Sequence, residues 1–263
     1  MVQLSFKLPD RLYQNFMNEV RKRKSIRENG VSEALEEAVI LWIARGKKGI
    51  AVVVKDDIKK ELKRLGLKEG DFVLVHSSLS SLGYVEGGAD TVIDALLETV
   101  GKEGTVLVPT LTHSIVNSKN PVFDVKWTPS VTGHIPEVFR KRPEARRSLH
   151  PTHSVAAIGA KAEYIIKDHE KNSTPCSRNS PYGKIVELGG YILFLGVDLR
   201  CNTTFHAMEE WANVPGRFTE EMEQLHSIDE KGNDIPVPSK RHRSVPNDFR
   251  KMEPFLFLEG IMR

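Results

Sequence analysis

The sequence predicts an α/β domain whose helices cover both faces of a sheet, preceded by a smaller N-terminal segment. Apolar runs with the length of strands alternate with segments of helical periodicity between residues 54 and 196. Strands that alternate with helices in this way are typical of a sheet covered on both faces. Residues 1–48 have a different pattern and a basic excess, with ten Lys/Arg and six Asp/Glu.

Composition favours a globular cytoplasmic protein. The chain has 263 residues, of which 40% are hydrophobic, and no apolar run reaches the roughly 18 residues of a membrane helix. The N-terminus lacks the charged and apolar regions of a signal peptide. Cys176 and Cys201 are the only cysteines, which argues against a disulfide framework and fits a reducing compartment. Neither a CxxC nor an HExxH spacing occurs, so no metal site is predicted.

The N-terminal segment is predicted to be a strand followed by two helices. Residues 2–8 alternate apolar and polar side chains, which predicts a strand with one solvated face. Pro9 and Asp10 begin a helix, and Ser32 caps a second helix over residues 33–44. This order resembles a ribbon-helix-helix segment, in which two chains pair their strands and polar ribbon residues enter the DNA major groove.

The ribbon-helix-helix resemblance implies a homodimer or larger assembly and makes DNA a candidate partner. Gln3, Ser5 and Lys7 occupy the ribbon positions. So short a strand, with apolar helix faces beside it, is not stable in a monomer, so pairing is expected even if the segment is only a dimerising arm. Residues 45–49 are predicted to be a linker. The expected domains are therefore 1–48 and 49–263.

The larger domain is predicted to begin with a helix over residues 54–65 that ends at Gly66. Strand-like apolar runs follow at Phe72–Val75, Val106–Pro109, Ser154–Ile158 and Tyr191–Gly196. Helical patterns lie at Ala89–Val100, Gly133–Arg140, Lys161–Asp168 and Ser180–Leu188. From residue 216 to residue 247 the chain is polar and is predicted to be rich in loops.

Polar residues at the end of the first of these strands predict a site for an anion. The apolar run ends in His76-Ser77-Ser78, and Gly87-Gly88 precedes a helix. Unpaired amides and the dipole at a helix N-terminus favour phosphate or pyrophosphate. The alternative is an ordinary strand–turn–helix unit in which the glycines serve tight turns.

His206 is the best candidate for a general base. A histidine has a pKa near neutrality, and a carboxylate beside it fixes the tautomer and stabilises the imidazolium. Glu209 lies three residues further on, where one helical turn places both side chains on one face. Asp198 and Glu210 are further candidates to orient the base. The alternative is a structural histidine with satisfied nitrogens.

Four segments with a fixed order carry a family resemblance. They are Val73–Ser114, RSLHPTHSVAAIG (Arg147–Gly159), SPYGKIVELGGYILFLGVD (Ser180–Asp198) and NTTFHAMEE (Asn202–Glu210). Together they resemble the aminoglycoside 3-N-acetyltransferase family over the region from Lys55 to Arg217. The resemblance implies a three-layer α/β/α sandwich with a mixed sheet, and acetyl-CoA as co-substrate. It also implies that His206, in a stretch similar to the family's NTxLHxxE motif, is the general base of direct acetyl transfer to an amine.

The same resemblance assigns residues to the two substrates. It implies that these residues contact CoA: His76, Ser77, Ser78, Leu79, Ser80, Gly87, Thr110, Ser180, Tyr182 and Lys184. His150, His153 and Glu210 are expected on the acceptor side, with packing under a loop as the alternative for His150. Three further histidines are expected in loops or at the surface: His113, His134 and His169.

Two departures from the family pattern bear on the substrates. Cys176-Ser177 follow Pro175 where the family often has Phe-Gly, which alters one wall of the expected cofactor channel. The stretch Lys240–Arg243 is basic where aminoglycoside-active members have acids. A basic patch repels a polycationic drug, so an amino sugar on an anionic carrier is expected to be the better acceptor. The alternatives are a solvated loop or a site for the 3′-phosphate of CoA. The nearby acids are expected to be solvated: Glu220, Glu221 and Glu223.

These observations predict a cytoplasmic acetyl-CoA-dependent N-acetyltransferase that acts on an amino sugar or aminoglycoside-like amine. The alternative is a DNA-binding regulator that uses a CoA-binding domain as a sensor. Loss of the base would favour the regulator, but His206 is present. A Ser hydrolase is discounted because no GxSxG sequence occurs. The resemblance also implies a C-terminal part shorter than is usual in the family.

Overall fold

A five-stranded mixed sheet forms the centre of the larger of two units. The computed structural model describes residues 52–243 and 248–262, together with Gln14. The chain divides into Met1–Val52 and Val53–Arg263. The predicted ribbon-helix-helix segment lies outside the described residues, so its pairing and DNA contact stay predictions. None of the helices in the described part is long and apolar enough to cross a membrane.

The main sheet contains both parallel and antiparallel neighbours. Its strands are β2 (Phe72–Ser77), β4 (Thr105–Pro109), β6 (Arg146–Arg147), β7 (Val155–Gly159) and β8 (Tyr191–Leu195). Their order is β6–β7–β4–β2–β8. β2 is parallel to β4 and β8, whereas β7 is antiparallel to both β4 and β6. The predicted mixed sheet is confirmed.

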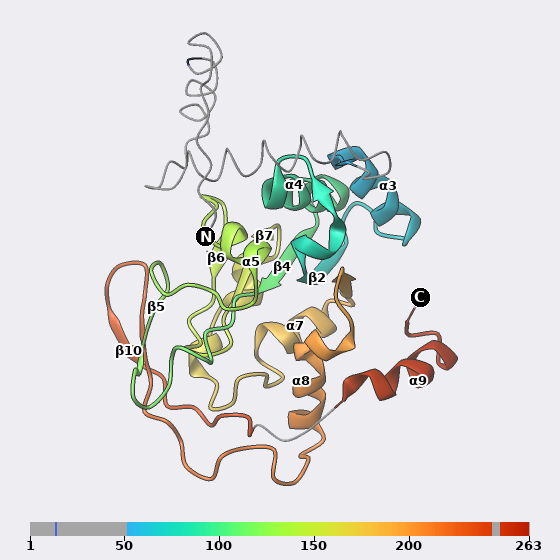
Figure 1. Ribbon diagram of the computed structural model, residues 1–263. Helices are drawn as coiled ribbons and strands as arrows, with labels where there is room; N and C mark the ends of the chain where they lie inside the picture. The colour runs from blue at the N-terminus through green and yellow to red at the C-terminus, as the bar shows by residue number, and fades with distance from the viewer. Residues whose placement is uncertain (1–13, 15–51, 244–247, 263) are drawn as a thin grey trace, which may run out of the picture. The chain divides into compact units, whose positions relative to one another are not determined.

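Alternation of side chains along the strands divides the apolar interior into two cores. Val73 and Val75 of β2 belong to one core, and Leu74 between them belongs to the other. The first core takes residues from α3 (Lys55–Arg64), α4 (Gly88–Val100) and α5 (His134–Phe139). The second takes residues from α6 (Ala162–Ile166), α7 (Pro181–Glu187) and α8 (Thr203–Trp211). Figure 1 shows α4 on one side of β2 and β4, and α7 with α8 on the other.

Shorter elements complete the described part of the chain. β1 (Val52–Val53) pairs with β3 (Tyr84–Val85), and β5 (Val122–Asp124), β9 (His226–Ile228) and β10 (Asp234–Pro236) form a sheet in the order β10–β9–β5. The 3-10 helices are η1 (Leu79–Leu82), η2 (His169–Lys171), η3 (Leu199–Cys201) and η4 (Phe249–Met252). The last helix is α9 (Glu253–Leu258).

The first strand of the main sheet is longer than the sequence predicts. The apolar run ends at Val75, but β2 continues because His76 pairs with Phe194 and Ser77 pairs with Leu195 of β8. Backbone pairing with a parallel neighbour does not require an apolar side chain. His76 and Ser77 are therefore rigid strand residues rather than loop residues.

The parallel strands β2, β4 and β8 direct their carboxyl ends to one edge of the sheet. At this edge lie Ser77, Pro109 and Leu195, and the chain beyond β8 continues into η3 and α8. Ligands of open α/β sheets bind at the carboxyl ends of the strands. The fold therefore brings the polar ends of three strands together with the start of α8.

Arg147, on the edge strand β6, joins the sheet to a neighbouring loop. Its side chain is buried and donates hydrogen bonds to the Thr110 hydroxyl and carbonyl, to the Ser154 hydroxyl and to the Thr128 carbonyl. The guanidinium also lies 4.7 Å from the centroid of the Phe123 ring. A planar group with five donors can satisfy these acceptors together, which the ammonium of a lysine cannot.

We expect Arg147→Lys to lower the free energy of unfolding by about 2–4 kcal/mol, because several buried acceptors lose their donors. Arg146→Lys is the matched control. Within the described part of the chain this side chain bonds only to the nearby carbonyls of Pro143 and Ala145, so the loss of stability should stay within about 0.5 kcal/mol. Urea unfolding of both variants measures the difference. Equal stabilities would mean that the buried guanidinium does not anchor the loop.

Candidate active site

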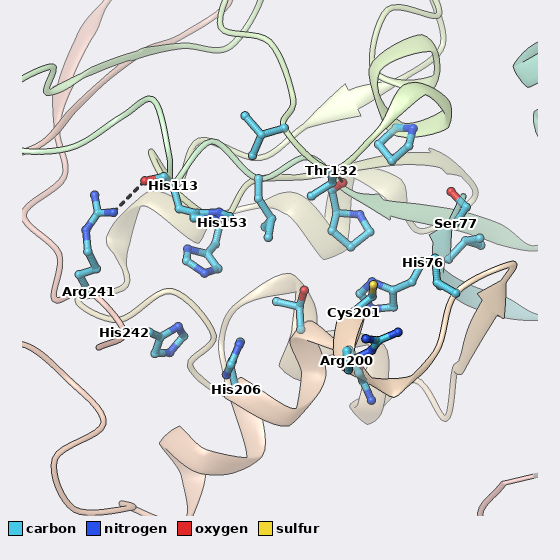
Figure 2. A pocket seen from close by; sticks show the side chains of 18 of the residues that line it. His76, Ser77, His113, Thr132, His153, Arg200, Cys201, His206, Arg241 and His242 are labelled. Atoms are coloured by element: carbon cyan, nitrogen blue, oxygen red, sulfur yellow. Dashed lines mark hydrogen bonds between the residues drawn. The ribbon is translucent and has the colours of Figure 1, made fainter. Parts of the chain in front are cut away.

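A cavity of about 580 Å³ lies at the carboxyl ends of the parallel strands. Figure 2 shows His153, His206 and His242 on one side of it and His76 with Arg200 on another. The lining contains five histidines and four arginines: His76, His113, His153, His206, His242, Arg200, Arg217, Arg241 and Arg243. Among the described residues, no Asp or Glu lines it. The cavity therefore presents nitrogen bases and cations to a ligand.

His206 is positioned by the start of α8. The side chain of Asn202 caps this helix by accepting a hydrogen bond from the Thr204 amide at 3.0 Å. One turn into the helix, His206 Nδ1 lies 2.8 Å from Glu209 Oε2. The structure thus brings together the predicted base and the carboxylate predicted to orient it. Nε2 remains as the ring nitrogen of His206 with no partner among the described residues.

Arg217 completes a three-residue cluster with this pair. Its Nη2 lies 2.8 Å from His206 Nδ1, and its Nε lies 2.6 Å from Glu209 Oε2. Nδ1 can donate to the carboxylate or accept from the guanidinium, but not both at once. When it donates to Glu209, Nε2 has a free lone pair and can act as a base. The choice of tautomer therefore decides whether His206 can accept a proton.

The surroundings of His206 favour its neutral form. Burial is the largest cause that lowers the pKa of His206 below its ordinary value, and the charges of His242 and Arg217 lower it further. The hydrogen bond to Glu209 opposes them and raises it. Because the net shift is downward, the imidazole is uncharged at neutral pH. An uncharged imidazole is the form that accepts a proton.

His242 lies beside His206 and is held by Glu210. The two imidazole rings are 5.0 Å apart, and His242 Nε2 lies 2.7 Å from Glu210 Oε1. The same carboxylate oxygen accepts a hydrogen bond from the Cys176 amide at 2.8 Å. Glu210 was predicted on the acceptor side and as a partner of the base. Its carboxylate instead lies buried behind His242, because it satisfies these two donors.

The two histidines of the HPTHS stretch lie in different surroundings. His153 lines the cavity, and its ring is 5.3 Å from that of His242. His150 is fully buried and bonds to the Ser239 hydroxyl, which fits the packing alternative. Burial is the main cause that lowers the pKa of both rings well below the ordinary value. Both are therefore neutral at neutral pH, and only His153 faces a ligand.

Of the residues expected to contact CoA, His76 and Ser77 line the cavity. The Nε2 atom of His76 and the Oγ atom of Ser77 are buried and have no partner among the described residues. The His76 ring stacks on Phe194, with 5.6 Å between centroids, and burial lowers the pKa of His76 to about 4. Two uncharged polar atoms are thus free to bond a ligand.

The other expected CoA contacts lie beside the cavity or within the protein. Ser78 bonds to the hydroxyls of Ser80 and Ser81, Leu79 packs against the first core, and Gly87 is the left-handed residue that precedes α4. Four of these residues do not line the cavity: Thr110, Ser180, Tyr182 and Lys184. The first three are fully buried, and Lys184 donates to the carbonyls of Tyr164 and Lys167. These side chains support the fold and do not line the cavity.

Asp198 does not orient the base. Its carboxylate accepts a hydrogen bond from the Arg200 amide, which begins η3, and pairs with the Arg200 guanidinium at 2.7 Å. The assignment of Asp198 to His206 is therefore corrected, because a nearer cation and a helix cap use both of its oxygens. Arg200 itself lines the cavity.

The predicted basic patch is a set of ion pairs. Arg241 and Arg243 line the cavity, whereas Lys240 does not. Arg241 pairs with Glu223 at 2.9 Å, and Arg243 pairs with Glu220 at 3.2 Å. The expectation that Glu223 is solvated was wrong, because its side chain is only 18% exposed. Repulsion of a cationic acceptor is weaker than the sequence alone indicates.

Three side chains around His206 had no signal in the sequence. Arg217 and His242 come from loops that follow α8, and Phe249 of η4 places its ring 5.2 Å from that of His206. His169 was expected in a loop or at the surface, but it is fully buried and bonds to the Ser148 hydroxyl and the Pro175 carbonyl. Long-range contacts of this kind leave no spacing pattern.

Comparison with known proteins gives a consistent result. A family model described as aminoglycoside 3-N-acetyltransferase matches residues 74–263. Aminoglycoside N(3)-acetyltransferase VII of Streptomyces paromomycinus is 34% identical over 200 residues, which cover 70% of this chain and 69% of that protein. The solved structure of aminoglycoside acetyltransferase AAC(3)-Xa has a TM-score of 0.71 at 31% identity, over 86% of this chain and 87% of its own. The structure of AAC-IIIb in binary complex with CoASH has a TM-score of 0.69 at 28% identity, over 80% and 86%.

We expect the pKa of His206 in the free protein to lie below 6.5, with burial as the main cause. Glu209→Gln should lower this pKa further, because a carboxylate that stabilises the imidazolium is lost. Arg217→Gln should raise it, because a repelling cation is removed. NMR titration of the ring nitrogens measures all three proteins. A wild-type pKa above 6.5 would mean that the ring is charged at neutral pH and is not poised to accept a proton.

Proposed function

The chain belongs to the aminoglycoside 3-N-acetyltransferase family of acyltransferases, and we propose that it transfers the acetyl group of acetyl-CoA to a primary amine on an amino sugar or aminoglycoside-like acceptor. The observation that carries this proposal is the His206–Glu209 pair in the wall of the cavity. The proposal includes direct transfer with His206 as general base, and a complete three-layer α/β/α sandwich as the scaffold.

The residues of the cavity fit a thioester and an amine. Acetyl-CoA supplies an activated acetyl group whose leaving group is a thiol. His206 Nε2 accepts a proton from the acceptor amine as its nitrogen attacks the carbonyl carbon, and Glu209 stabilises the imidazolium that forms. The imidazolium then gives this proton to the departing sulfur, which restores the neutral ring. Arg217 Nε lies 2.6 Å from Glu209 Oε2 and so positions the carboxylate beside the base.

Two further groups support binding of the co-substrate at the ends of β2 and β8. His76 Nε2 and Ser77 Oγ have no partner among the described residues, so each can bond a carbonyl or an amide of the ligand. Arg200 lines the same end of the cavity, and its side chain is 64% exposed. An exposed guanidinium suits a phosphate group. We therefore place the CoA side of the cavity near His76, Ser77 and Arg200.

We expect His206→Ala to lower kcat by about 100-fold or more, the usual loss for a general base, with little change in CoA affinity. Glu209→Gln should cost less, because the base itself remains. Release of the CoA thiol measures turnover, and calorimetry measures CoA binding. Retention of the wild-type rate in His206→Ala would move the role of base to another histidine, with His153 next.

The matched control is His226→Ala. His226 is also paired with a carboxylate, Asp234, at 2.9 Å, but it does not line the cavity. Its turnover should equal that of the wild type. A loss as large as that of His206→Ala would show that the assay reports stability rather than chemistry. Absence of CoA binding to the wild type at millimolar ligand would overturn the proposed function itself.

For the acceptor, we expect an amino-sugar nucleotide to be used better than kanamycin-type or gentamicin-type drugs. No carboxylate lines the described cavity, so an ammonium group has to compete with Arg241 for Glu223. Arg241→Gln frees this carboxylate and should raise kcat/KM for the drugs by about 10-fold, which corresponds to about 1.4 kcal/mol. The nucleotide should gain nothing from the change.

Lys240→Gln is the control for acceptor choice, because it removes a charge from the same stretch without touching the lining. Arg241 also donates to the carbonyls of His113 and Val116, so thermal unfolding must accompany the rates. Efficient acetylation of the drugs by the wild type would mean that Glu220 or Glu223 already accepts their ammonium groups. If Arg241→Gln and Lys240→Gln raised kcat/KM for the drugs equally, the increase would be due to net charge alone.

A further inference from the structure

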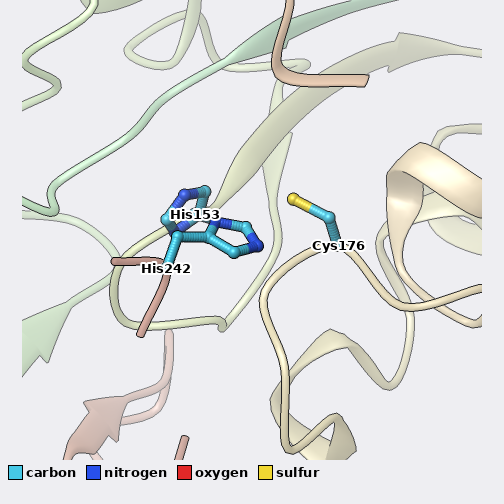
Figure 3. A group of neighbouring side chains, drawn as sticks. All are labelled: His153, Cys176 and His242. Carbon is cyan, nitrogen blue, oxygen red and sulfur yellow. The ribbon is translucent and has the colours of Figure 1, made fainter. Parts of the chain in front are cut away.

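Three potential ligands for a metal ion meet beside the base. One nitrogen of His153, the sulfur of Cys176 and one nitrogen of His242 all lie within 4.8 Å of one another. Figure 3 shows the sulfur of Cys176 directed toward the two imidazole rings. The three residues come from separate loops, before β7, before α7 and after β10. The fold alone brings them together.

The hydrogen bonds of both histidines leave one lone pair for the cluster. His153 Nδ1 bonds to the Thr152 hydroxyl at 2.8 Å, which leaves Nε2. His242 Nε2 bonds to Glu210, which leaves Nδ1 as the ring nitrogen that faces the cluster. This Nδ1 atom is buried without a partner among the described residues, and only 8% of the His242 side chain is exposed. A buried polar atom without a partner is costly unless a ligand satisfies it.

Glu210 supports the cluster from behind. The same oxygen accepts from His242 Nε2 at 2.7 Å and from the Cys176 backbone amide at 2.8 Å, so it orients the His242 ring and positions the backbone of Cys176. Metal-binding histidines usually donate their other ring N–H to a carboxylate or carbonyl. The side chain of Glu210 is 4% exposed, and a buried negative charge is stabilised by a nearby cation.

We propose that His153, Cys176 and His242 form a binding site for a divalent transition-metal ion of the zinc type, with a fourth position open to the cavity. One thiolate and two imidazoles are ligands that zinc prefers, and three protein ligands with an open position are typical of its non-structural sites. Tetrahedral geometry at the usual bond lengths places ligand atoms about 3.5 Å apart, so the side chains close by about 1 Å on binding.

The ion replaces the proton of the thiol. Burial, with a contribution from Glu210, raises the pKa of Cys176, so the empty site holds a neutral thiol that is a poor nucleophile. Binding releases this proton to solvent and leaves a thiolate bonded to the metal. The site has a consequence for transfer, since the His242 ring is 5.0 Å from that of His206. A cation here opposes protonation of the base and inhibits the enzyme.

The site is independent of the proposed function and is tested by binding rather than by activity. Co²⁺ is added to chelator-treated full-length protein, and the absorption spectrum is recorded. One equivalent should produce the thiolate-to-cobalt charge-transfer band and the intense visible bands of a four-coordinate ion. Cys176→Ser should lose the charge-transfer band, and Cys201→Ser, which changes a cysteine that does line the cavity, should retain it. A band that survives in Cys176→Ser, or that is lost in Cys201→Ser, would overturn the assignment.

A second measurement covers the case in which Cys176→Ser does not fold. Calorimetry with Zn²⁺ should show His242→Ala binding about 10-fold or more weakly than the wild type, with His226→Ala unchanged as the matched control. Circular dichroism establishes that the variants are folded. Wild-type protein that binds neither Co²⁺ nor Zn²⁺ at micromolar concentrations would refute the site, while leaving the acetyltransferase proposal intact.

Discussion

Two adjacent carboxylates at the end of α8 organise the site, and each depends on its own set of partners. Glu209 faces His206 and Arg217, whereas Glu210 faces His242 and the Cys176 amide. Consecutive residues of a helix are rotated by about 100°, so neighbours in sequence serve different clusters. Removal of a partner that leaves a buried polar group unsatisfied costs about 1–3 kcal/mol. The carboxylates that position the two histidines therefore also hold the C-terminal loops against α8.

Local pairing also explains how four arginines line one cavity without a matching excess of positive charge. Arg200, Arg217, Arg241 and Arg243 each have a carboxylate partner that lies outside the lining. A ligand in the cavity therefore contacts guanidinium groups, and the acids that pair with them lie outside the lining. The guanidinium groups can donate hydrogen bonds to phosphates or carbonyls, whereas an ammonium group would have to displace an arginine from its carboxylate. The selectivity of the cavity depends on which charges line it more than on the net charge.

The sequence predicts those parts of the molecule that depend on local patterns. Apolar runs locate four of the five strands of the main sheet and miss the short edge strand β6, and the three-residue spacing predicts the contact of His206 with Glu209. Family motifs do not locate individual side chains, because Tyr182 and Thr110 stand at the ends of elements, where a side chain can enter either the core or the cavity. Which side it enters depends on packing across the sheet, which spacing does not encode.

Contacts between loops that are distant in sequence have no local sequence pattern that predicts them. His242 was assigned to a basic patch because Lys240, Arg241 and Arg243 surround it in sequence, but its ring packs between Phe218 and His206. Its placement follows from the Glu210 carboxylate, 32 residues away, which requires a donor once buried. A single carboxylate thus places His242, from a stretch predicted to be a basic patch, in the wall of the cavity.

A residue that departs from the family pattern supplies one ligand of the proposed metal site. Cys176 stands where the family often has phenylalanine, and its sulfur lies within 4.8 Å of a nitrogen of each of two imidazoles, a set of ligands that suits zinc. The proposed metal site involves Glu210, which bonds to His242, whereas Glu209 keeps its bond to His206. The two adjacent carboxylates of α8 thus support the metal site and the base separately. An ion held by His242 would act on His206 through its charge, since the two imidazole rings are 5.0 Å apart. Occupancy of the cluster would thereby oppose protonation of the base.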